Sequence, residues 1–529
     1  MGGGGLRGHD VTATATASIA KSRLTSAIAI DRAAREAQAV VERAKVQARA
    51  HEVTRPSRHR KLARDWGSAN SIVGMDARQL RDQARHLERD LDIADNALNV
   101  LVQNTVGSGI DVLAAPRLPG QPINRALAEQ VDDLWDGWWD APEVTGMHDY
   151  GACQQLLCRT WMRDGESYYQ DLIGTVPGLV HGTPVPYSIE MIEPDLIPLD
   201  MIDPARNILQ GVEKNAWGRA VAYHVYKTHP GDAWGATLET KRVSADVLHG
   251  IRNTKRLHQV RGLSVFASAM SRFEDVKDYE ESERIAAKVA ASMCAYIKKG
   301  NPDRYGETAG GVAGQMVTPE AGDRELRFVP GVVFDDLLQG EDIGMIDSNR
   351  PNPNAANWRM DQLRAAAGGI GVSYSSLTRN YDGTYSAQRQ ELVEQWGGYL
   401  MLAERFIALA VRKHRLRFIE AAVLAGKLRL PRGWQLRHLA ASTYVRPVMP
   451  WIDPLKEAYG RGEAEDRGWT SPQQNTLLYG NNPNDVERER ADWAARRAEL
   501  GDAPQPAPAT AQADRSAIRA ASITAALRD

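Results

Sequence analysis

The sequence predicts an α+β fold in which long helices accompany an antiparallel β region. Apolar residues recur at three- and four-residue intervals within two long stretches, 264–298 and 385–430, which is the pattern of a helix with one buried face. Several segments between 167 and 251 instead alternate apolar and polar residues, which is typical of strands. A chain of 529 residues has room for about three domains and a sizeable core.

Charge and cysteine content exclude several classes of protein. The chain has 65 Lys and Arg against 67 Asp and Glu, so it is not a protein that grips phosphates over its whole surface, and any contact with DNA must be local. Cys153, Cys158 and Cys294 form no CxxC pair, which favours buried thiols in a reducing cytosol over a disulfide framework. No run of about 18 apolar residues exists, so no membrane span is expected.

Residues 1–75 are expected to form a basic, partly disordered N-terminal arm. Residues 1–65 contain 13 Lys and Arg against 6 Asp and Glu, with the highest density of positive charge at 55–64. Two interpretations remain open. The arm docks on an acidic surface or on nucleic acid, or it is a solvated leader without a partner.

Residues 76–260 are expected to begin with helices. Asp76 is the expected N-cap of a helix that runs to about Leu101, and two further helices follow at 126–139 and 149–163. The first of these two has an aromatic face, which is more typical of a core than of a ligand site. That face is formed by Leu134, Trp135, Trp138 and Trp139.

The strands of this region are expected further along the chain. The alternation predicts a strand at 186–192, a hairpin made by 208–213 and 220–226, and a single strand at 243–251.

Asp164 and Glu166 flank Gly165 and have two interpretations. They form a pair of carboxylates that serves chemistry, or they belong to a turn that leads into a strand at 167–169. The glycine between them favours the turn.

The next expected element is a long helix over 261–299. Ser264 is its expected N-cap, its apolar residues thin out over 277–284, and it runs to about Lys298. The segment 300–350 then looks like a separate small unit, rich in glycine and with short strands at 325–329 and 331–334. An insertion between two helices projects from them, and such a projection is a suitable place for a partner to dock.

Residues 351–370 are expected to form a second, shorter helix over 355–367. The glycines at 368, 369 and 371 are expected to end it, because glycine adopts the positive φ of a helix stop. Residues 371–384 follow as a short polar loop with one cation, Arg379, and one anion, Asp382.

The stretch 385–430 contains no proline and is expected to be one helix of about 40 residues, bent at Gly397-Gly398. On periodicity alone it could also be a coiled-coil arm or part of a large all-α core. Residues 431–501 are expected to form shorter helices, including one that starts at Thr470-Ser471-Pro472, and 502–529 to be a disordered tail rich in Ala and Pro.

No catalytic motif is present in the sequence. It contains no GxxxxGK[ST] loop, no HExxH, no GxSxG, no paired CxxC and no GxGxxG that opens a strand–helix unit. We therefore expect a protein that is not an enzyme and that has no catalytic residues, cofactor or metal site.

A set of short stretches, in order along residues 70–500, resembles the lambda-type portal proteins of tailed phages. Each stretch alone has low specificity for the family, but the occurrence of all of them in the same order is more specific. They are 104–110 (NTVGSGI), Trp161 with 164–166, 192–195 (IEPD), 211–213 with 218–225, 261–264 (RGLS), 371–374 (GVSY), 385–389 (YSAQR) and 451–457 (WIDPLKE).

The resemblance implies a ring of twelve copies at one capsid vertex, through which double-stranded DNA is packaged and later ejected. In this mapping 76–260 is the wing and 261–299 a stem helix. The clip, 300–350, would bind the large terminase subunit and later the head-completion or adaptor proteins. The remaining parts are the second stem helix 351–370, the tunnel loop 371–384, the long wing helix 385–430 and the crown 431–501.

The resemblance further implies that the tunnel loop faces DNA. A conduit should contact DNA weakly, because each phosphate neutralised by a cation strengthens sequence-independent binding. The loop fits this, with a single arginine among small polar residues. Its expected DNA-facing residues are Ser373, Tyr374, Ser375, Ser376, Thr378, Arg379, Asn380, Tyr381, Asp382, Gly383 and Thr384.

The same resemblance implies further partners and a location. The expected partners include the major capsid and scaffolding proteins, with non-specific, transient DNA contact and no membrane. The expected location is the virion, and the host cytoplasm during assembly. Two alternatives remain: another oligomeric virion component, such as a head–tail adaptor or minor capsid protein, and a nuclease that uses Asp164 or Glu166.

Overall fold

The computed structural model describes residues 32, 35–38, 67–232, 237–291, 295–299, 341–345, 354–450 and 454–499. The chain divides into two compact units, Met1–Ser68 and Ala69–Asp529, and the account below concerns the second. The basic stretch 55–64, the expected strands at 325–334 and the expected tail 502–529 lie outside the described residues.

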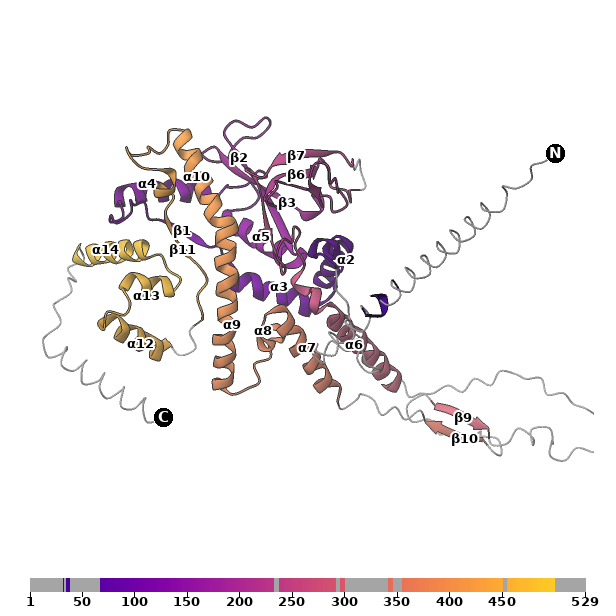
Figure 1. Cartoon of the computed structure of the whole chain (residues 1–529). Coiled ribbons are helices and arrows are strands. Elements are labelled where there is room, and N and C mark those ends of the chain that lie inside the picture. The colour runs from indigo at the N-terminus through magenta and orange to yellow at the C-terminus, as the bar shows by residue number, and fades with distance from the viewer. Residues whose placement is uncertain are drawn as a thin grey trace, which may run out of the picture. The chain divides into compact units, whose positions relative to one another are not determined.

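Helices and antiparallel sheets together make an α+β unit (Figure 1). The α-helices are α2 (Ala69–Asp90), α3 (Asp92–Thr105), α4 (Arg125–Trp139), α5 (Tyr150–Asp164), α6 (Met270–Ala291), α7 (Ala355–Ile370), α8 (Tyr374–Thr378), α9 (Tyr385–Phe406), α10 (Arg412–Leu424), α11 (Leu436–Leu439), α12 (Pro454–Asp466), α13 (Pro472–Leu478) and α14 (Pro483–Glu499). Two 3-10 turns, η2 (Pro194–Leu196) and η3 (Val265–Ser268), and the π turn η5 (Ile407–Val411) complete the helical elements among the described residues from Ala69 onward.

The strands form small antiparallel sheets. One sheet has the order β3-β2-β8 and another the order β4-β5-β6-β7, while β1 pairs with β11 and β9 with β10. The strands are β1 (Asp111–Ala114), β2 (Glu166–Ile173), β3 (Tyr187–Ile192), β4 (Ile208–Leu209), β5 (Val212–Lys214), β6 (Ala220–Tyr226), β7 (Thr240–Ser244), β8 (Leu248–Arg252), β9 (Ala295–Lys299), β10 (Glu341–Met345) and β11 (Ser442–Val445).

The long helix is confirmed. Elements α9, η5 and α10 run without a break from Tyr385 to Leu424, and Figure 1 shows α9 and α10 as one orange column. This column packs against α3 and against the sheet of β2, β3 and β8. The helix stays α-helical through Gly397-Gly398, where the sequence predicts a bend, and its irregularity is the π turn.

The tryptophans of α4 belong to the core, as the sequence favoured. Trp135 and Trp138 are buried, with ring centroids 4.7 Å apart, and Trp135 meets Phe418 of α10 edge to face at 5.0 Å. The indole N–H of Trp138 donates to the carbonyl of Tyr187 at 2.8 Å, so this polar group is satisfied in the core. Cys153 and Cys158 are also buried, as expected.

The first expected helix is wrong in both its start and its continuity. It begins at Ala69, because Val73 and Ala77 extend its buried face and pack with Leu199. It stops at Leu91, whose extended backbone (φ −130°, ψ 109°) separates α2 from α3.

Two predicted strands are interrupted. The segment 208–213 turns at Gln210-Gly211, both with positive φ, to give β4 and β5. A Cβ at Gly211 would lie 2.7 Å from the carbonyl oxygen of Pro198, so this turn requires glycine. The segment 243–251 is not one strand, because a turn at 245–247 sends β7 and β8 into different sheets.

The two expected stem helices also need correction at their ends. After the 3-10 turn that Ser264 caps, α6 ends at Ala291, and 295–299 is strand β9 rather than helix. Helix α7 continues through Gly368 and Gly369 to Ile370 and ends at Gly371 (φ 89°). Gly369 instead permits close packing, since a Cβ there would lie 3.3 Å from the Ser268 hydroxyl.

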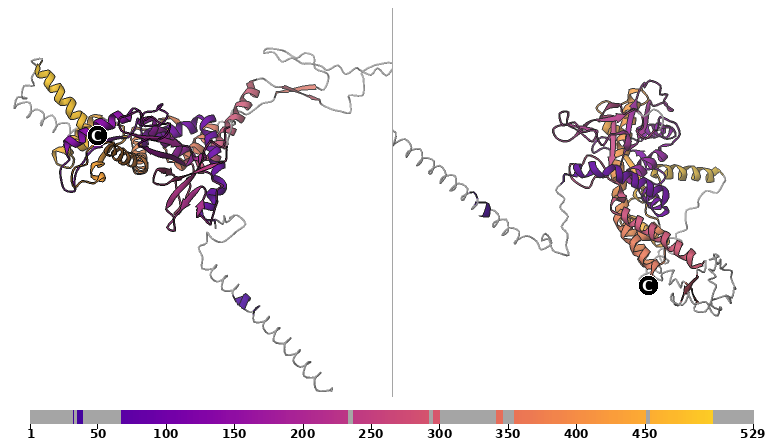
Figure 2. Two further views of the ribbon diagram at one scale, coloured as in Figure 1. Left: turned by 90° about the horizontal axis from the view of Figure 1, so that it is seen from above. Right: turned by 90° about the vertical axis from the view of Figure 1, so that its right-hand side faces the viewer.

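Helices α6 and α7 pack against each other, as the right-hand view of Figure 2 shows. The rings of Tyr279 and Trp358 are 4.4 Å apart, and Arg272 donates to Gln362 at 2.9 Å. Beyond Val276, the described side chains of α6 are half-buried or exposed, as the thinning of its apolar residues predicted. No described helix is long and apolar enough to cross a membrane.

Candidate functional site

The expected polar loop 371–384 divides into two halves with different environments. Val372 and Leu377 are buried, and residues 374–378 form the short helix α8 rather than a loop. Residues 379–384 are all exposed, and we call Arg379–Thr384 the exposed strip. The expectation that the whole segment is an open loop is therefore wrong for its first half, because Leu377 provides an apolar side chain that the core takes up.

Helix α8 is fixed by polar contacts at both ends. The hydroxyl of Ser373 accepts a hydrogen bond from the backbone N–H of Ser376 at 3.1 Å, which caps the N-terminus. Ser375 donates to Glu391 of α9 at 2.6 Å, and the side chain of Asn96 on α3 contacts the C-terminal end. Ser373, Tyr374, Ser375, Ser376 and Thr378 are thus half-buried against their own chain.

The exposed strip carries little net charge and leads directly into α9. It contains one cation, Arg379, and one anion, Asp382, and Tyr381 is 61% exposed. Arg379 adopts the left-handed region (φ 53°, ψ 24°) at the end of α8. The hydroxyl of Thr384 caps α9 by accepting from the N–H of Ala387, so the strip is held at both ends.

Asp164 and Glu166 flank a turn, which is the interpretation that the glycine between them favoured. Gly165 ends α5 in the left-handed region (φ 86°), and Asp164 and Glu166 are buried. Asp164 accepts from Arg85 at 2.7 Å and from Arg163 at 2.7 Å. Most of the arginines around these two carboxylates come from distant parts of the chain, so no local pattern in the sequence signals the pairing.

Glu166 lies between two buried arginines. Arg81 of α2 donates to it at 2.9 Å and Arg261 at 2.6 Å, while the N–H of Gly262 and the hydroxyl of Tyr168 add further hydrogen bonds. Burial by itself raises the pKa of Glu166, but the charges and hydrogen bonds of Arg261 and Arg81 outweigh it and hold the pKa below its ordinary value. Glu166 is therefore held by partners from its own chain, which is the arrangement of a structural buried ion pair.

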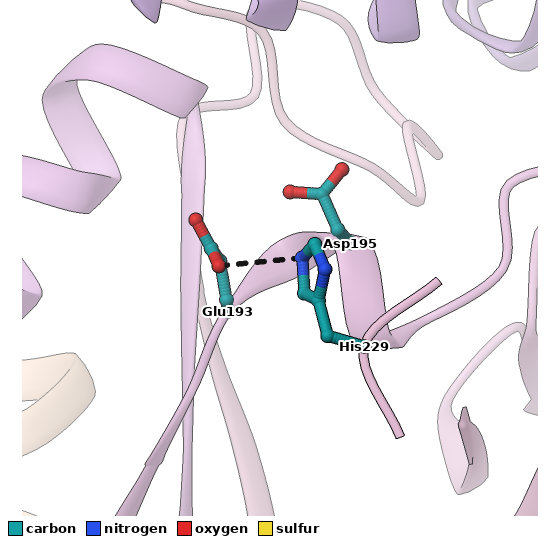
Figure 3. Close-up of side chains that lie close together, drawn as sticks. All are labelled: Glu193, Asp195 and His229. Atoms are coloured by element: carbon teal, nitrogen blue, oxygen red, sulfur yellow. Dashed lines mark ion pairs between the residues drawn. The ribbon is translucent and has the colours of Figure 1, made fainter. Parts of the chain in front are cut away.

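One group of side chains has the composition of a metal site. The ligand atoms of Glu193, Asp195 and His229 lie within 4.8 Å of one another (Figure 3). However, Arg85 donates to Glu193 at 2.8 Å and pairs with Asp195, and Arg81 pairs with Asp195 at 3.0 Å. These guanidinium groups already neutralise both carboxylates. We therefore assign the cluster to the arginine network and not to a metal site.

The protein-family model described as phage portal protein, lambda family, matches residues 55–402. The chain therefore belongs to the lambda family of phage portal proteins. The probable portal protein of Halomonas phage phiHAP-1 is 24% identical over 467 residues, which cover 84% of this chain and 86% of that protein. Portal protein B of Escherichia phage lambda is 25% identical over 247 residues, 43% of this chain and 46% of the relative.

The solved structures reported next match this chain with TM-scores below 0.5. A chain from the neck of an empty GTA particle, computed with C6 symmetry, is 13% identical, with 79% of this chain and 95% of that chain covered and a TM-score of 0.41. An HK97 family phage portal protein from Corynebacterium diphtheriae is 10% identical, with coverages of 64% and 90% and a TM-score of 0.32.

Proposed function

We propose that copies of this chain, twelve in number, form a ring at one vertex of a phage capsid, and that double-stranded DNA enters and leaves through its centre. Membership of the lambda portal family supports this role. In this proposal α6 and α7 are the stem and 300–350 is the clip. The region 385–430, whose helix ends at Leu424, is the long wing helix, and 431–501 is the crown. A ring requires a heterologous interface whose rotation closes, and the exposed faces of α6 beyond Val276 are available for one.

The observation that carries the DNA-facing part of the proposal is the exposed strip. It is an exposed run of polar residues and one tyrosine, held at both ends by secondary structure and with balanced charge. Such a surface can touch a moving polyanion without forming many ion pairs, since affinity for DNA rises with each neutralised phosphate. We propose that Arg379–Thr384 lines the passage, and not residues 373–378, which are half-buried or, at Leu377, buried.

The partners of the proposed ring follow from the same role. We infer that the clip binds the large terminase subunit during packaging and head-completion or adaptor proteins afterwards, and that the wing and crown contact major capsid and scaffolding proteins. The protein would then reside in the virion after assembly in the host cytoplasm. We expect no ATP hydrolysis by the purified ring, because the motor activity would belong to the terminase.

A small deletion tests the role of the exposed strip. Deleting Asn380–Gly383 leaves the cap residue Thr384 and the whole of α8 in place. We expect rings with a central hole in electron micrographs, but particles that fail to package DNA or to retain it. The matched control deletes Pro177–Gly178, an exposed pair in the loop between β2 and β3, and should package normally. A strip deletion that fills and holds complete genomes would refute the DNA-facing assignment, while the absence of rings from the unaltered protein would refute the portal proposal itself.

A further inference from the structure

The side chain of Asn96, on α3, makes four hydrogen bonds at the base of the exposed strip. Its amide nitrogen donates to the carbonyl oxygens of Ser376 at 3.0 Å and Leu377 at 2.7 Å. Its amide oxygen accepts from Nε of Arg379 at 3.2 Å and from Nη2 at 3.1 Å. Both donor hydrogens and both lone pairs of one amide are therefore used at a single point.

These bonds meet needs that α8 cannot meet itself. A helix of five residues leaves its last carbonyl groups without partners inside the helix, and Asn96 supplies donors for two of them. The residue that follows, Arg379, takes a left-handed backbone conformation, which is unfavourable for a side chain with a Cβ. The bonds between Asn96 and the guanidinium of Arg379 offset that cost.

We propose that Asn96 is a positioning residue for the exposed strip, which anchors its entry point and holds the guanidinium of Arg379 against α3. The first part of this proposal concerns the folded chain alone. The second part rests on the proposed function, because it matters only if DNA passes the strip.

The consequence for DNA follows from the charge of the strip. Arg379 is the one cation among residues 379–384. While Asn96 holds two of its nitrogen atoms, its planar fork is directed at the protein and is less able to form the bidentate contact that arginine makes with phosphate. Release of Arg379 would give each subunit a stronger phosphate contact, and a ring of such contacts would impede a translocating duplex.

Limited proteolysis of the full chain tests the anchor without a ring or DNA. In Asn96→Ala, we expect trypsin to cleave after Arg379 about tenfold faster, since local opening governs cleavage and several hydrogen bonds oppose it. The matched control is Asn104→Ala on the same helix, because the Asn104 amide donates to the Val100 carbonyl of α3 itself at 2.8 Å. Cleavage of Asn96→Ala at the rate of the unaltered chain and of the control would overturn the anchor.

A second variant distinguishes the role of the amide nitrogen of Asn96 from that of its amide oxygen. Asn96→Asp keeps two acceptor oxygens for Arg379 but has no N–H for the carbonyl groups of Ser376 and Leu377. We expect faster cleavage after Arg379 in this variant also, because the α8 carbonyl groups lose their donors. This variant also serves if Asn96→Ala does not fold.

Binding of a short blunt-ended DNA duplex to the assembled protein, measured over a range of salt concentrations, tests the role of Arg379. We expect the salt dependence to be steeper in Asn96→Ala, by up to about 0.9 in the log–log slope for each cation released. The slope should return to that of the unaltered protein in Asn96→Ala/Arg379→Gln. In Asn96→Asp it should equal that of the unaltered protein. An unchanged slope in Asn96→Ala would overturn the positioning of Arg379. If the unaltered protein forms no ring, the proposed function fails while the proteolysis still decides the anchor.

Discussion

The phenolic hydroxyl of Tyr169 on β2 donates a hydrogen bond to the carbonyl oxygen of Leu409 at 2.9 Å, within the π turn of the long helix. A π turn shifts the hydrogen-bond ladder by one residue and leaves a carbonyl without its α-helical partner. Tyr169 supplies a side-chain donor from the sheet to one carbonyl group of this turn. The sheet and the long helix are therefore joined at the irregular point of that helix.

We predict that Tyr169→Phe lowers the free energy of unfolding by about 1–2 kcal/mol, because the Leu409 carbonyl loses its side-chain donor. Urea denaturation followed by circular dichroism would measure the change. Tyr385→Phe, at a tyrosine that is 52% exposed, is the control and should be close to neutral. Equal stability of the two variants would show that the bond does not support the π turn.

Breaking the buried ion pairs of Glu166 should be far more costly. In Glu166→Gln the buried guanidinium of Arg261 loses its counter-ion, and that of Arg81 loses one of its two carboxylate partners. Removing one partner of a buried pair typically costs about 3–5 kcal/mol. We expect a large fall in melting temperature or loss of soluble protein, whereas the exposed control Glu487→Gln should behave as the unaltered chain. A Glu166→Gln variant of normal melting temperature would contradict this.

The same carboxylate predicts how stability depends on acid. The pKa of Glu166 is lower in the folded chain than its ordinary value of 4.5, so the folded state holds this proton less tightly than the unfolded state. Its contribution is present above that value and is lost as the pH falls through the lowered pKa. We expect thermal stability to decline below about pH 4.5, and a stability that stays constant down to about pH 3 would count against the pairing.

Asp136 predicts an opposite dependence. Burial and the neighbouring charges of Asp111 and Asp132 raise its pKa to about 6 from an ordinary 3.8, so the folded state favours the proton. Stability is therefore lost as the pH rises from about 4 to about 6. We expect Asp136→Asn to stabilise the chain above about pH 6, by less than about 1 kcal/mol because the side chain is partly solvated, and to have no such effect near about pH 4. Glu129→Gln on the same helix is the control, and a melting-temperature gain that does not vary with pH would contradict the explanation.

Two glycine substitutions should have opposite effects. At Gly165 a Cβ would lie 2.2 Å from the Leu263 carbonyl carbon, and φ is 86°, so Gly165→Ala should destabilise the chain strongly. Gly137 lies inside α4, and an added Cβ there would have nothing within 4 Å, so Gly137→Ala should stabilise by about 0.5–1 kcal/mol. Thermal denaturation of both variants gives the comparison, and a loss of stability at Gly137 would contradict it.

Much of the fold is predictable where a local pattern is long. The helix from Tyr385 to Leu424 follows from an apolar stripe that persists over many turns, and the aromatic core of α4 follows from three tryptophans that share one helix. The ends of elements are less predictable. Leu91 interrupts a helix without Gly or Pro, and Gly369 permits packing where the sequence predicts a helix stop, since both depend on what the rest of the chain places nearby.

The sequence identifies the polar segment proposed as the site, but not which part of that segment is exposed. The sequence identifies 371–384 as short, polar and nearly neutral, yet it does not separate the buried Leu377 from the exposed Tyr381. That separation depends on α3, which lies far away in the sequence and packs against α8. The role of Asn96 cannot be predicted from the sequence for the same reason. An asparagine inside a helix carries no local signal of the backbone groups that it will bind.

By itself the sequence determined the class of elements and the family, because periodicity, charge balance and short ordered motifs are properties of neighbouring residues. Only the tertiary structure decided which polar groups meet, since Arg81 and Arg261 reach Glu166 across long stretches of chain. Desolvation makes such buried charges depend on partners with well-defined geometry, and that geometry exists only after distant segments have packed together.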